Sequence, residues 1–475
     1  MPPTSIQSFF SSSSPSKSSP GDGFTPDEMT LPASASTWTP TLDYEESSIG
    51  SLEPGPRNLT LMGRIVNFYE VPKPSKRPSA AQGYVKIMLA DDTGSMTVRL
   101  WYNKTEYKVK LGQLVSVWTV HVSMGSEHTS LAPTAAPLFT SIYPEGERNC
   151  YFMVHERIDD GNMFKRPFGV RDSQVLPGLM TLKNFTDGGY DVEDCKLLVC
   201  VKSIGARKKF TNKNGTTSEL TTVGIFDDTT EAQLTLYGPV SNSASSWTPS
   251  QTVLLVANPG WRIDRTAKLS LNANTQLHID PNTADARYVR ALAQRLTKKE
   301  HVNPAFPADL FDVEAAESAA VRVLYMLSEI DEFARGNPRE KIMGYISVLV
   351  TEFHVVTNYK RNMLMSTECC GLPIFANAVT AKCRQCNKDN VLRINPRILG
   401  NIIDETGQIS SGKLILSDDA WEQLLGRTAE QLVTAPLDVM KYLEQRLLFL
   451  RLTLGFGLYL GNDEVGRLAI WCVKM

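Results

Sequence analysis

A hairpin-like pattern recurs three times in this chain and constrains its fold more than any other feature. The copy at Leu89–Trp101 is echoed at Ile225–Tyr237, and a shorter copy lies at Ile402–Ile409. Each copy has an apolar strand, an acidic pair that favours a tight turn, and then a second strand. Copies more than a hundred residues apart do not fit a propeller or a solenoid. We therefore expect one β-hairpin in each of three domains.

Length and local composition indicate where these domains begin and end. A chain of 475 residues suits three or four domains of about 100 to 150 residues. Residues 1–56 are rich in Ser, Pro and Thr and are expected to form a disordered tail. Helical spacing at Tyr288–Leu296 and Val313–Phe333 predicts a helical connector. The expected units after the tail are a β domain at 57–156, a linker at 157–189, a β domain at 190–298, a helical linker at 299–338 and a β domain at 339–475.

Charge and cysteine usage exclude several classes of protein. The formal net charge is -2 and the pI is about 6.4, so any nucleic-acid site must use local basic groups. No secretory or membrane-spanning segment is expected, because Arg451 interrupts the most apolar stretch, Leu447–Leu460. Four of the eight cysteines lie between Cys369 and Cys386. This clustering favours a metal site in a reducing compartment over a disulfide framework.

Several segments resemble the large subunit of replication protein A. Those that resemble its second DNA-binding OB (oligonucleotide/oligosaccharide-binding) domain are Val201–Gly205, Leu236–Gly238, Lys268–Leu271 and His278–Pro281. Lys341–Ile346 and Ala420–Gly426 resemble the zinc-containing OB domain of the same family. The resemblance covers most of residues 57–475. It implies a mainly β fold of three tandem OB barrels, the third with a zinc-ribbon insertion, in a single-stranded-DNA-binding protein located in the nucleus on chromosomes.

Two segments narrow the expected role. Ser246–Pro249 and Lys202–Gly205 are similar to the meiosis-specific OB-domain branch of this family. That similarity implies homologous recombination, in meiosis or in DNA repair, with a second OB-containing or recombination protein as partner. It also raises the alternative of a 3'-directed single-strand DNA exonuclease. A further alternative is a protein-interaction scaffold similar to the shieldin subunit with tandem OB domains. Because only Lys474 and Met475 follow the last expected strand, we expect no replacement of the large subunit in the standard heterotrimer.

The candidate DNA-binding residues are aromatic side chains that stack on bases and basic side chains that follow the phosphates. Tyr237 and Trp101 end the hairpins of the second and first domains, and Trp261 lies between two later strands. Aromatic residues at these places can instead fill barrel interiors, and this alternative stays open. The candidate basic residues lie in or beside the loop between the first two strands, where OB folds hold oligonucleotides. They are Lys73, Lys76 and Arg77 in the first domain and Lys202, Arg207, Lys208, Lys209 and Lys213, with an embedded Phe210, in the second.

The acidic pairs of the repeat do not by themselves indicate a nuclease. Paired carboxylates can hold catalytic magnesium, but an Asp at a tight turn also binds local backbone N–H groups. No further cluster of His, Asp or Glu recurs beside the pairs. We therefore name no catalytic residue, and an enzymatic role stays uncertain.

The cysteine cluster predicts one structural zinc ion. Cys383 and Cys386 have the spacing of a zinc knuckle, and Cys370 precedes them by a suitable loop. The fourth ligand is left open between Cys369, His354 and none, because adjacent cysteines chelate one ion awkwardly. No general-base Glu accompanies the cluster, so a catalytic zinc ion is not expected.

The N-terminal tail contains a motif that resembles a sliding-clamp-binding peptide. Ile6, Phe9 and Phe10 have the apolar-x-x-aromatic-aromatic spacing, although Pro3 stands where a Gln is expected. We expect these three side chains to contact the clamp.

Overall fold

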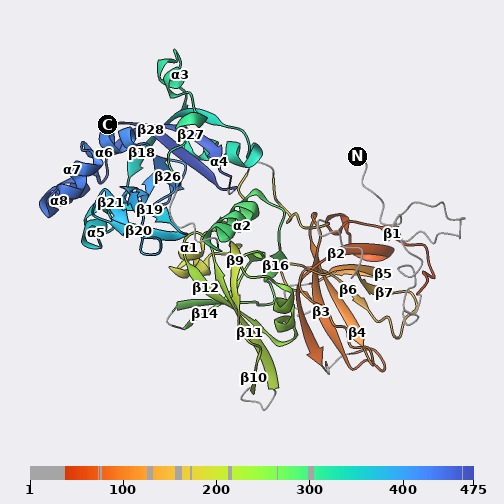
Figure 1. Ribbon diagram of the computed structural model, residues 1–475. Helices are drawn as coiled ribbons and strands as arrows, with labels where there is room; N and C mark the ends of the chain where they lie inside the picture. Colours follow the sequence, from red (N-terminus) through yellow and green to blue (C-terminus); the bar gives the residue numbers. More distant parts are fainter. Residues whose placement is uncertain are drawn as a thin grey trace, which may run out of the picture.

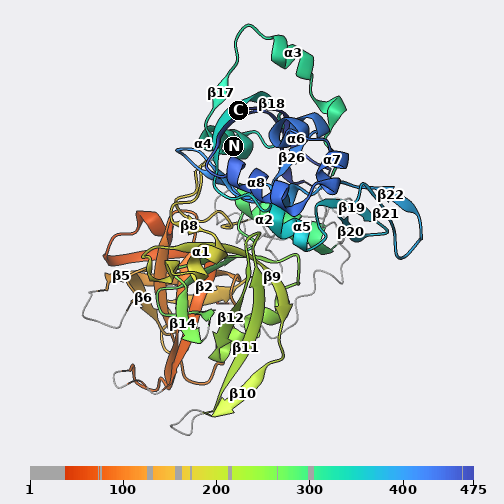
Figure 2. The ribbon, with the colours of Figure 1, turned by 90° about the vertical axis from the view of Figure 1, so that its left-hand side faces the viewer.

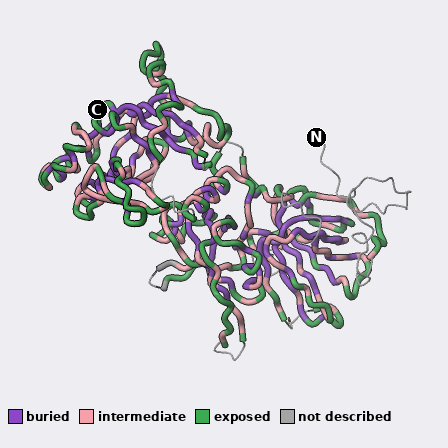
Figure 3. Tube along the Cα trace, in the orientation of Figure 1, coloured by how far each residue is buried: buried purple, intermediate pink, exposed green. Residues whose placement is uncertain are grey.

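The computed structural model describes residues 38–72, 74, 77–125, 132–155, 163–171, 174–211, 217–264, 266–297, 304–462 and 464–475. Over these residues the chain forms three β-barrels in sequence order, with the second between the first and the third (Figure 1). Buried positions concentrate along the barrel strands (Figure 3). The fold class expected from the sequence, mainly β with consecutive barrels, is confirmed.

The first barrel is a closed sheet whose strands follow the order 1-2-3-5-4. They are β2 (Gly55–Pro72), β3 (Gly83–Ala90), β4 (Ser95–Tyr102), β6 (Leu138–Ile142) and β5 (Leu114–Met124). Pairing of β2 with β5 closes the barrel, and only the β4–β6 pair within it is parallel. This is the topology of the OB fold, and we name the barrel OB1. The short β7 (Tyr151–Val154) extends the sheet beside β5.

The second barrel, OB2, repeats this strand order with a divided fifth strand. Its strands are β9 (Lys196–Ile204), β11 (Thr217–Phe226), β12 (Glu231–Tyr237), β15 (Thr266–Ser270) with β16 (Gln276–Ile279), and β13 (Val253–Ala257). Again the pair of third and fifth strands, β12–β15, is parallel. Other elements of OB2 are β8 (Leu179–Met180), α1 (Leu182–Thr186), η3 (Gly189–Asp191), β10 (Lys208–Thr211), η4 (Gly238–Ser246), β14 (Gly260–Asp264) and α2 (Ala284–Thr297). The β10–β11 hairpin projects away from the barrel (Figure 1).

The third barrel, OB3, has the same order with a divided third strand. Its strands are β18 (Ile342–Val350), β24 (Ile402–Ile403), β25 (Gln408–Ile409) with β26 (Leu414–Leu416), β28 (Gly466–Lys474) and β27 (Arg451–Leu460). Three helices join the third and fourth strands: α6 (Asp418–Leu425), α7 (Ala429–Thr434) and α8 (Leu437–Leu447).

A small ribbon is inserted between the first and second strands of OB3. Its elements are α5 (Val355–Lys360), β19 (Met365–Cys369), β20 (Leu372–Ala376), β21 (Thr380–Lys382), β22 (Asp389–Val391), β23 (Arg393–Ile394) and η6 (Pro396–Ile398). The inserted segment carries all four clustered cysteines.

The connector before OB3 is less helical than its sequence predicts. It comprises η5 (Ala308–Leu310), α3 (Val313–Ser318), β17 (Leu324–Tyr325) and α4 (Leu327–Gly336). The expected helix over Val313–Phe333 is therefore interrupted. Val321 and Val323 disfavour helix, and the Val323 carbonyl accepts the Tyr345 N–H as β17 pairs with β18. No described helix is long and apolar enough to cross a membrane.

Part of the predicted tail is packed onto OB1. The Trp38 ring stacks on Tyr151 with centroids 4.8 Å apart, and the indole Nε1 donates to the Arg148 carbonyl at 3.2 Å. The short β1 (Glu45–Glu46) then pairs with β2, and η2 (Ile49–Ser51) follows. The sequence missed this segment because its Ser-rich and Pro-rich surroundings masked a few well-placed aromatic residues.

The first acid of the OB1 hairpin binds two distant parts of the backbone. One carboxylate oxygen of Asp91 accepts the N–H groups of Thr93 and Gly94 and the Thr93 hydroxyl, at 2.6 to 2.9 Å. The other oxygen accepts the N–H of Ile49, just before the first strand, at 2.8 Å. The Thr93 hydroxyl in turn accepts the N–H of Gly50. We name this set of bonds the carboxylate clasp.

The same clasp is present in the other two barrels. In OB2 it joins Asp227, Thr229, Thr230, Leu182 and Lys183, and in OB3 it joins Asp404, Thr406, Gly407, Leu327 and Ser328. Each of these carboxylates binds local backbone N–H groups through one oxygen, as the turn interpretation of the acidic pairs predicts, and a distant N–H through the other, which the sequence did not predict.

OB1 and OB2 share a continuous apolar core. Leu111 and Val109 of OB1 belong to the same buried cluster as Val240 and Trp247 of OB2. Polar groups across this junction are also satisfied, since the buried Asn67 amide donates to two OB2 carbonyls at 2.8 Å. Because buried amides without partners cost about 1 to 3 kcal/mol, this match fixes how the two barrels meet.

OB2 and OB3 meet through charged side chains. Lys413 Nζ of OB3 lies 2.6 Å from the Asp228 carboxylate and also binds the Tyr288 hydroxyl. Arg335 of α4 binds Asp285 of α2 at 2.5 Å. This junction therefore depends on ion pairs rather than on a shared core.

The carboxylate clasp should stabilise each barrel strongly. We expect Asp91→Ala to lower the free energy of opening of β3 and β4 by about 2 to 3 kcal/mol, because charge-assisted hydrogen bonds to buried N–H groups are lost. Hydrogen-exchange mass spectrometry on the full chain measures this opening locally. Asp92→Ala is the matched control: its side chain is exposed and should change the same quantity by less than about 0.5 kcal/mol. Equal effects of the two substitutions would contradict the clasp.

Candidate nucleic-acid interface and metal centre

The outer surface of OB2 is defined by the alternation of side chains along its strands. Residues two apart on a strand, and residues paired across strands, share a face. Leu234 and Leu236 of β12 are fully buried inside the barrel. Their neighbours Gln233, Thr235 and Tyr237 therefore face outward.

Tyr237 forms an accessible aromatic site on this surface. Its side chain is 42% exposed, and its ring centroid lies 6.2 Å from that of Phe210 at 77°. Pairing of Lys208 with Leu220, and of Leu220 with Tyr237, places Lys208 on the same face. Two aromatic rings and a cation thus come together on one exposed surface.

The pairing register separates Lys208 from the other basic residues of the predicted loop. Lys209 is opposite Glu219 and faces the other side of the β10–β11 hairpin. Glu219 forms ion pairs with both Arg207 and Lys209. Only Lys208 of these three cations shares the face of Tyr237.

Further residues extend the surface toward the fifth strand. Ser270 pairs with Thr235, so Ser270 and Lys268 of β15 face outward, and the exposed Arg262 of β14 is opposite Lys268. Arg262 and Lys268 could not be predicted from the sequence, because their face follows from strand pairing that is not local in sequence. We name the resulting surface the Tyr237 face. It consists of Lys208, Phe210, Gln233, Thr235, Tyr237, Arg262, Lys268 and Ser270.

Trp261 lies on the opposite side of β14. It pairs with Leu269, which is fully buried and faces the barrel interior. The Trp261 side chain is 40% exposed, and its ring centroid is 4.3 Å from that of Tyr190. The structure therefore does not bring Trp261 together with Tyr237.

Trp101, at the matching place in OB1, is covered. Its side chain is only 4% exposed, and its Nε1 donates to the Ser141 hydroxyl at 2.7 Å. It packs with Ala81 and Tyr143, and the Arg99 guanidinium lies 5.3 Å from its ring centroid. This favours the alternative in which Trp101 has a packing role, because no free ring surface remains for a base.

Other outward-facing residues of OB1 are covered as well. Met88 and Lys86 are 4% and 5% exposed, and Thr97 donates to the Ala136 carbonyl. Ala273 of OB2 helps to line the small cavity that remains there, which has a volume of about 10 Å³. Such a cavity holds about one water molecule, so it is too small for a base. Burial, with a smaller effect of Arg99, lowers the pKa of Lys86 to about 8.

The remaining predicted residues fall into two groups. Lys202 forms an ion pair with Glu231, and Arg77 is exposed at the edge of OB1. The other predicted residues lie outside the described residues: Lys73, Lys76, Lys213, Ile6, Phe9 and Phe10.

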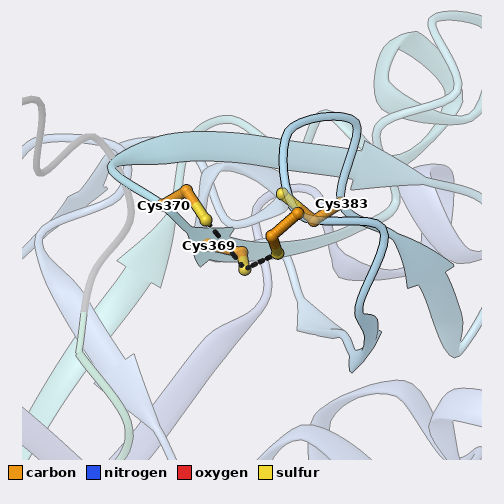
Figure 4. Close-up of side chains that lie close together, drawn as sticks. Cys369, Cys370 and Cys383 are labelled. Atoms are coloured by element: carbon orange, nitrogen blue, oxygen red, sulfur yellow. Dashed lines mark hydrogen bonds between the residues drawn. The ribbon is translucent and has the colours of Figure 1, made fainter.

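Four cysteine thiols lie together in the ribbon of OB3. Figure 4 shows Cys369 and Cys370 directed toward the loop that carries Cys383. The Sγ atoms of these three and of Cys386 all lie within 4.8 Å of one another, with Cys369 3.9 Å from Cys370 and 3.5 Å from Cys386. Four thiolates at about 2.3 Å from one tetrahedral ion would be about 3.8 Å apart. The cluster therefore has the size of a metal site.

A tight turn allows the adjacent cysteines to converge. Cys370 and Gly371 have φ of 55° and 69°, and Cys369 pairs with Leu372 across the turn. Two consecutive residues with positive φ are what a two-residue type I′ hairpin requires. His354, the other candidate ligand, lies instead 3.2 Å from Glu352. Among the described residues, no other group of three or more His, Cys, Asp or Glu side chains could hold a metal ion.

The loop around Cys383 favours its thiolate form. Backbone N–H groups of Cys386 and Gln385 donate to the Cys383 sulfur and lower the pKa of its thiol to about 7. A thiol that loses its proton readily binds metal more tightly near neutral pH.

Comparisons with known proteins give similarity at the level of solved structures. No family model and no curated protein matches the chain. A replication protein A heterotrimer bound to single-stranded DNA aligns over 89% of this chain and 94% of its own, with 12% identity and a TM-score of 0.36. The second OB-fold domain of replication protein A from Methanococcus maripaludis aligns with 20% of this chain and 90% of its own, with 16% identity and a TM-score of 0.16. A murine DNA-binding protein bound to double-stranded DNA aligns with 46% of this chain and 94% of its own, with 9% identity and a TM-score of 0.19. The OB assignment rests on the strand order and pairing of the three barrels.

Proposed function

We propose that this protein binds single-stranded DNA through the Tyr237 face of OB2. The observation that carries the proposal is the exposed Tyr237 ring beside Phe210 and Lys208 on the outer surface of an OB barrel. OB folds use this surface and its adjoining loops to bind oligonucleotides. Bases stack on aromatic rings, and cations bind the phosphates between them.

The proposed contact favours single strands over duplexes. Stacking on Tyr237 or Phe210 requires a base whose face is free, and bases in a duplex are already stacked on one another. The charge supplied by Lys208, Arg262 and Lys268 is local, since the whole chain has a net charge of -2. We therefore expect the protein to contact few phosphates, so that its affinity for DNA depends only modestly on salt.

In the cell, we place this activity in homologous recombination, in meiosis or in DNA repair, on chromosomes in the nucleus. The support is the resemblance of the segments around Lys202–Gly205 and Ser246–Pro249 to the meiosis-specific branch of the replication protein A family. The same resemblance supports a second OB-containing or recombination protein as partner. Ile6, Phe9 and Phe10 are proposed to bind the sliding clamp.

We further propose that the four cysteines hold one structural zinc ion. Four thiolates in a tetrahedral arrangement suit zinc, and a structural site of this kind has all its positions filled by protein. The ion would join the β19–β20 turn, which carries Cys369 and Cys370, to the β21–β22 turn, which carries Cys383 and Cys386. Its contribution would be to the stability of the ribbon.

Removal of the Tyr237 ring tests the DNA-binding face. We expect the full chain to bind a thymidine oligonucleotide more tightly than a duplex, and Tyr237→Ala to weaken this binding by about 1 to 3 kcal/mol, because one stacked base is lost. Fluorescence anisotropy at fixed salt measures both. Tyr442→Ala is the control, since Tyr442 is 61% exposed on α8 of OB3. Equal affinity for single strand and duplex would refute the proposal, and magnesium-dependent shortening of the oligonucleotide would support the exonuclease instead.

Lys208 and Lys209 form a matched pair for the phosphate path. Lys208→Ala should weaken oligonucleotide binding and reduce the slope of log affinity against log salt by about 0.7, the value for one lost phosphate contact on a single strand. Lys209→Ala should change the slope much less, because Lys209 faces Glu219 on the other side of the hairpin. A salt titration of both variants checks this. A larger loss of slope in Lys209→Ala than in Lys208→Ala would mean that the DNA strand runs along the Lys209 side of β10 and would contradict the prediction.

Metal analysis tests the cysteine cluster. We expect the purified chain to contain about one zinc ion, and the double variant Cys383→Ser with Cys386→Ser to contain none, because two of four ligands are lost. Cys472→Ala is the control: this buried cysteine of OB3 lies outside the cluster and should leave the zinc content unchanged. Metal-free protein with an intact ribbon would mean that packing alone holds the cysteines together.

A further inference from the structure

A second exposed surface of OB2 is apolar and distinct from the Tyr237 face. It lies at α1, η3 and β14, on the side of OB2 away from OB1 (Figure 1), and Figure 2 turns this side toward the viewer. Val192 is 54%, Trp261 40% and Ile263 56% exposed. With Tyr190, whose ring is next to that of Trp261, these residues form what we name the Trp261 patch.

The Trp261 ring of the patch is supported by aromatic residues beneath it. Tyr190 is 4.3 Å from Trp261 and makes an edge contact at 6.4 Å with Phe185, which is fully buried. Alternation along β14 places Trp261 and Ile263 on one face and Arg262 on the other. Tyr190 therefore links the Trp261 ring to the buried core of OB2. Clustered exposed apolar side chains with a rigid base are typical of interaction sites.

The exposed charges of the segment from α1 to β9 are mainly acidic. Against the one exposed cation Lys183, this segment carries four exposed carboxylates: Asp187, Asp191, Glu193 and Asp194. The nearest cation on β9, Lys196, donates to the Pro177 carbonyl at 2.6 Å. An acidic rim repels the phosphates of a nucleic acid, whereas it attracts a peptide that carries Lys or Arg.

We propose that the Trp261 patch binds a partner protein through a segment in which apolar side chains are flanked by basic ones. The apolar side chains would cover Trp261 and Ile263, and the basic ones would face Asp191 and Glu193. The acidic residues beside the patch are complementary to the basic residues of such a segment, and this favours a protein partner of this kind. The inference is independent of DNA binding by the Tyr237 face.

Peptide selection on the full chain tests this proposal. Random peptides displayed on phage are selected against the wild-type protein, and the selected peptides are then titrated against variants. We expect sequences enriched in Lys or Arg together with Leu or aromatic residues. Trp261→Ala and Glu193→Lys should each weaken these peptides by about tenfold or more, and Tyr442→Ala and Glu430→Lys, at exposed positions of OB3, should not. Added salt should weaken binding.

Several outcomes would overturn the proposal. Selected peptides that are acidic, or that bind the Trp261→Ala variant equally well, would do so. Concentration-dependent dimers of the wild type in sedimentation, absent in Trp261→Ala, would identify a second copy of the chain as the occupant. If Trp261→Ala lowers the thermal midpoint, Ile263→Ser takes its place, because Ile263 is 56% exposed.

An oligonucleotide titration separates this inference from the proposed function. Trp261→Ala should leave the affinity for a thymidine oligonucleotide within about twofold of wild type, while Tyr237→Ala reduces it. Equal losses in both variants would place Trp261 in the DNA interface and refute the protein-docking site. If neither variant loses affinity for the oligonucleotide, DNA binding by the Tyr237 face is refuted, while the peptide result is unaffected.

Discussion

The carboxylate clasp is the interaction on which each barrel depends, because it joins parts of the chain that are far apart in sequence. Asp91, Asp227 and Asp404 each bind a backbone N–H that lies 42, 45 or 77 residues earlier. That N–H precedes the first strand, while the carboxylate sits in the turn between the second and third strands. The clasp therefore fixes the hairpin of strands two and three relative to strand one. In OB2 this hairpin carries Tyr237, so the same bonds set the orientation of the proposed DNA-binding surface.

The second acid of each pair takes no part in the clasp, and its contacts differ from barrel to barrel. Asp92 of OB1 is exposed, Asp228 of OB2 binds Lys413 across the junction with OB3, and Glu405 of OB3 binds Arg451 within its own barrel. Hydrogen bonds from Leu327, Thr406 and their neighbours outweigh the effect of burial and hold the pKa of the clasp residue Asp404 below its usual value. The repeat thus keeps the acid that forms the clasp and lets the adjacent position vary.

The sequence predicted the barrels well because their signals are local. Alternating apolar residues and an acidic turn lie within a few residues of one another, and they recur. The candidate site was predicted less completely, because its geometry depends on pairing between distant segments. Trp101 and Tyr237 end equivalent hairpins, yet one is 4% and the other 42% exposed, since OB1 and OB2 pack differently around them. Strand register likewise separates Lys208 from Lys209. The left-handed conformation of Cys370, which lets adjacent cysteines converge, also has no clear signal in the sequence.

The two junctions between barrels are held by different interactions. This difference determines how firmly each neighbouring barrel is held beside the proposed DNA-binding surface of OB2. OB1 and OB2 share an apolar core, which salt does not weaken. Binding at the proposed Tyr237 face then does not require ordering of OB1 against OB2. OB3 is joined to OB2 by the partly exposed pair of Lys413 and Asp228 and by Arg335 with Asp285. Salt screens the pair of Lys413 and Asp228, whose side chains are 32% and 24% exposed, more than the better buried pair of Arg335 and Asp285, at 14% and 22%. We therefore expect added salt to weaken the junction of OB2 and OB3 more than the apolar junction of OB1 and OB2.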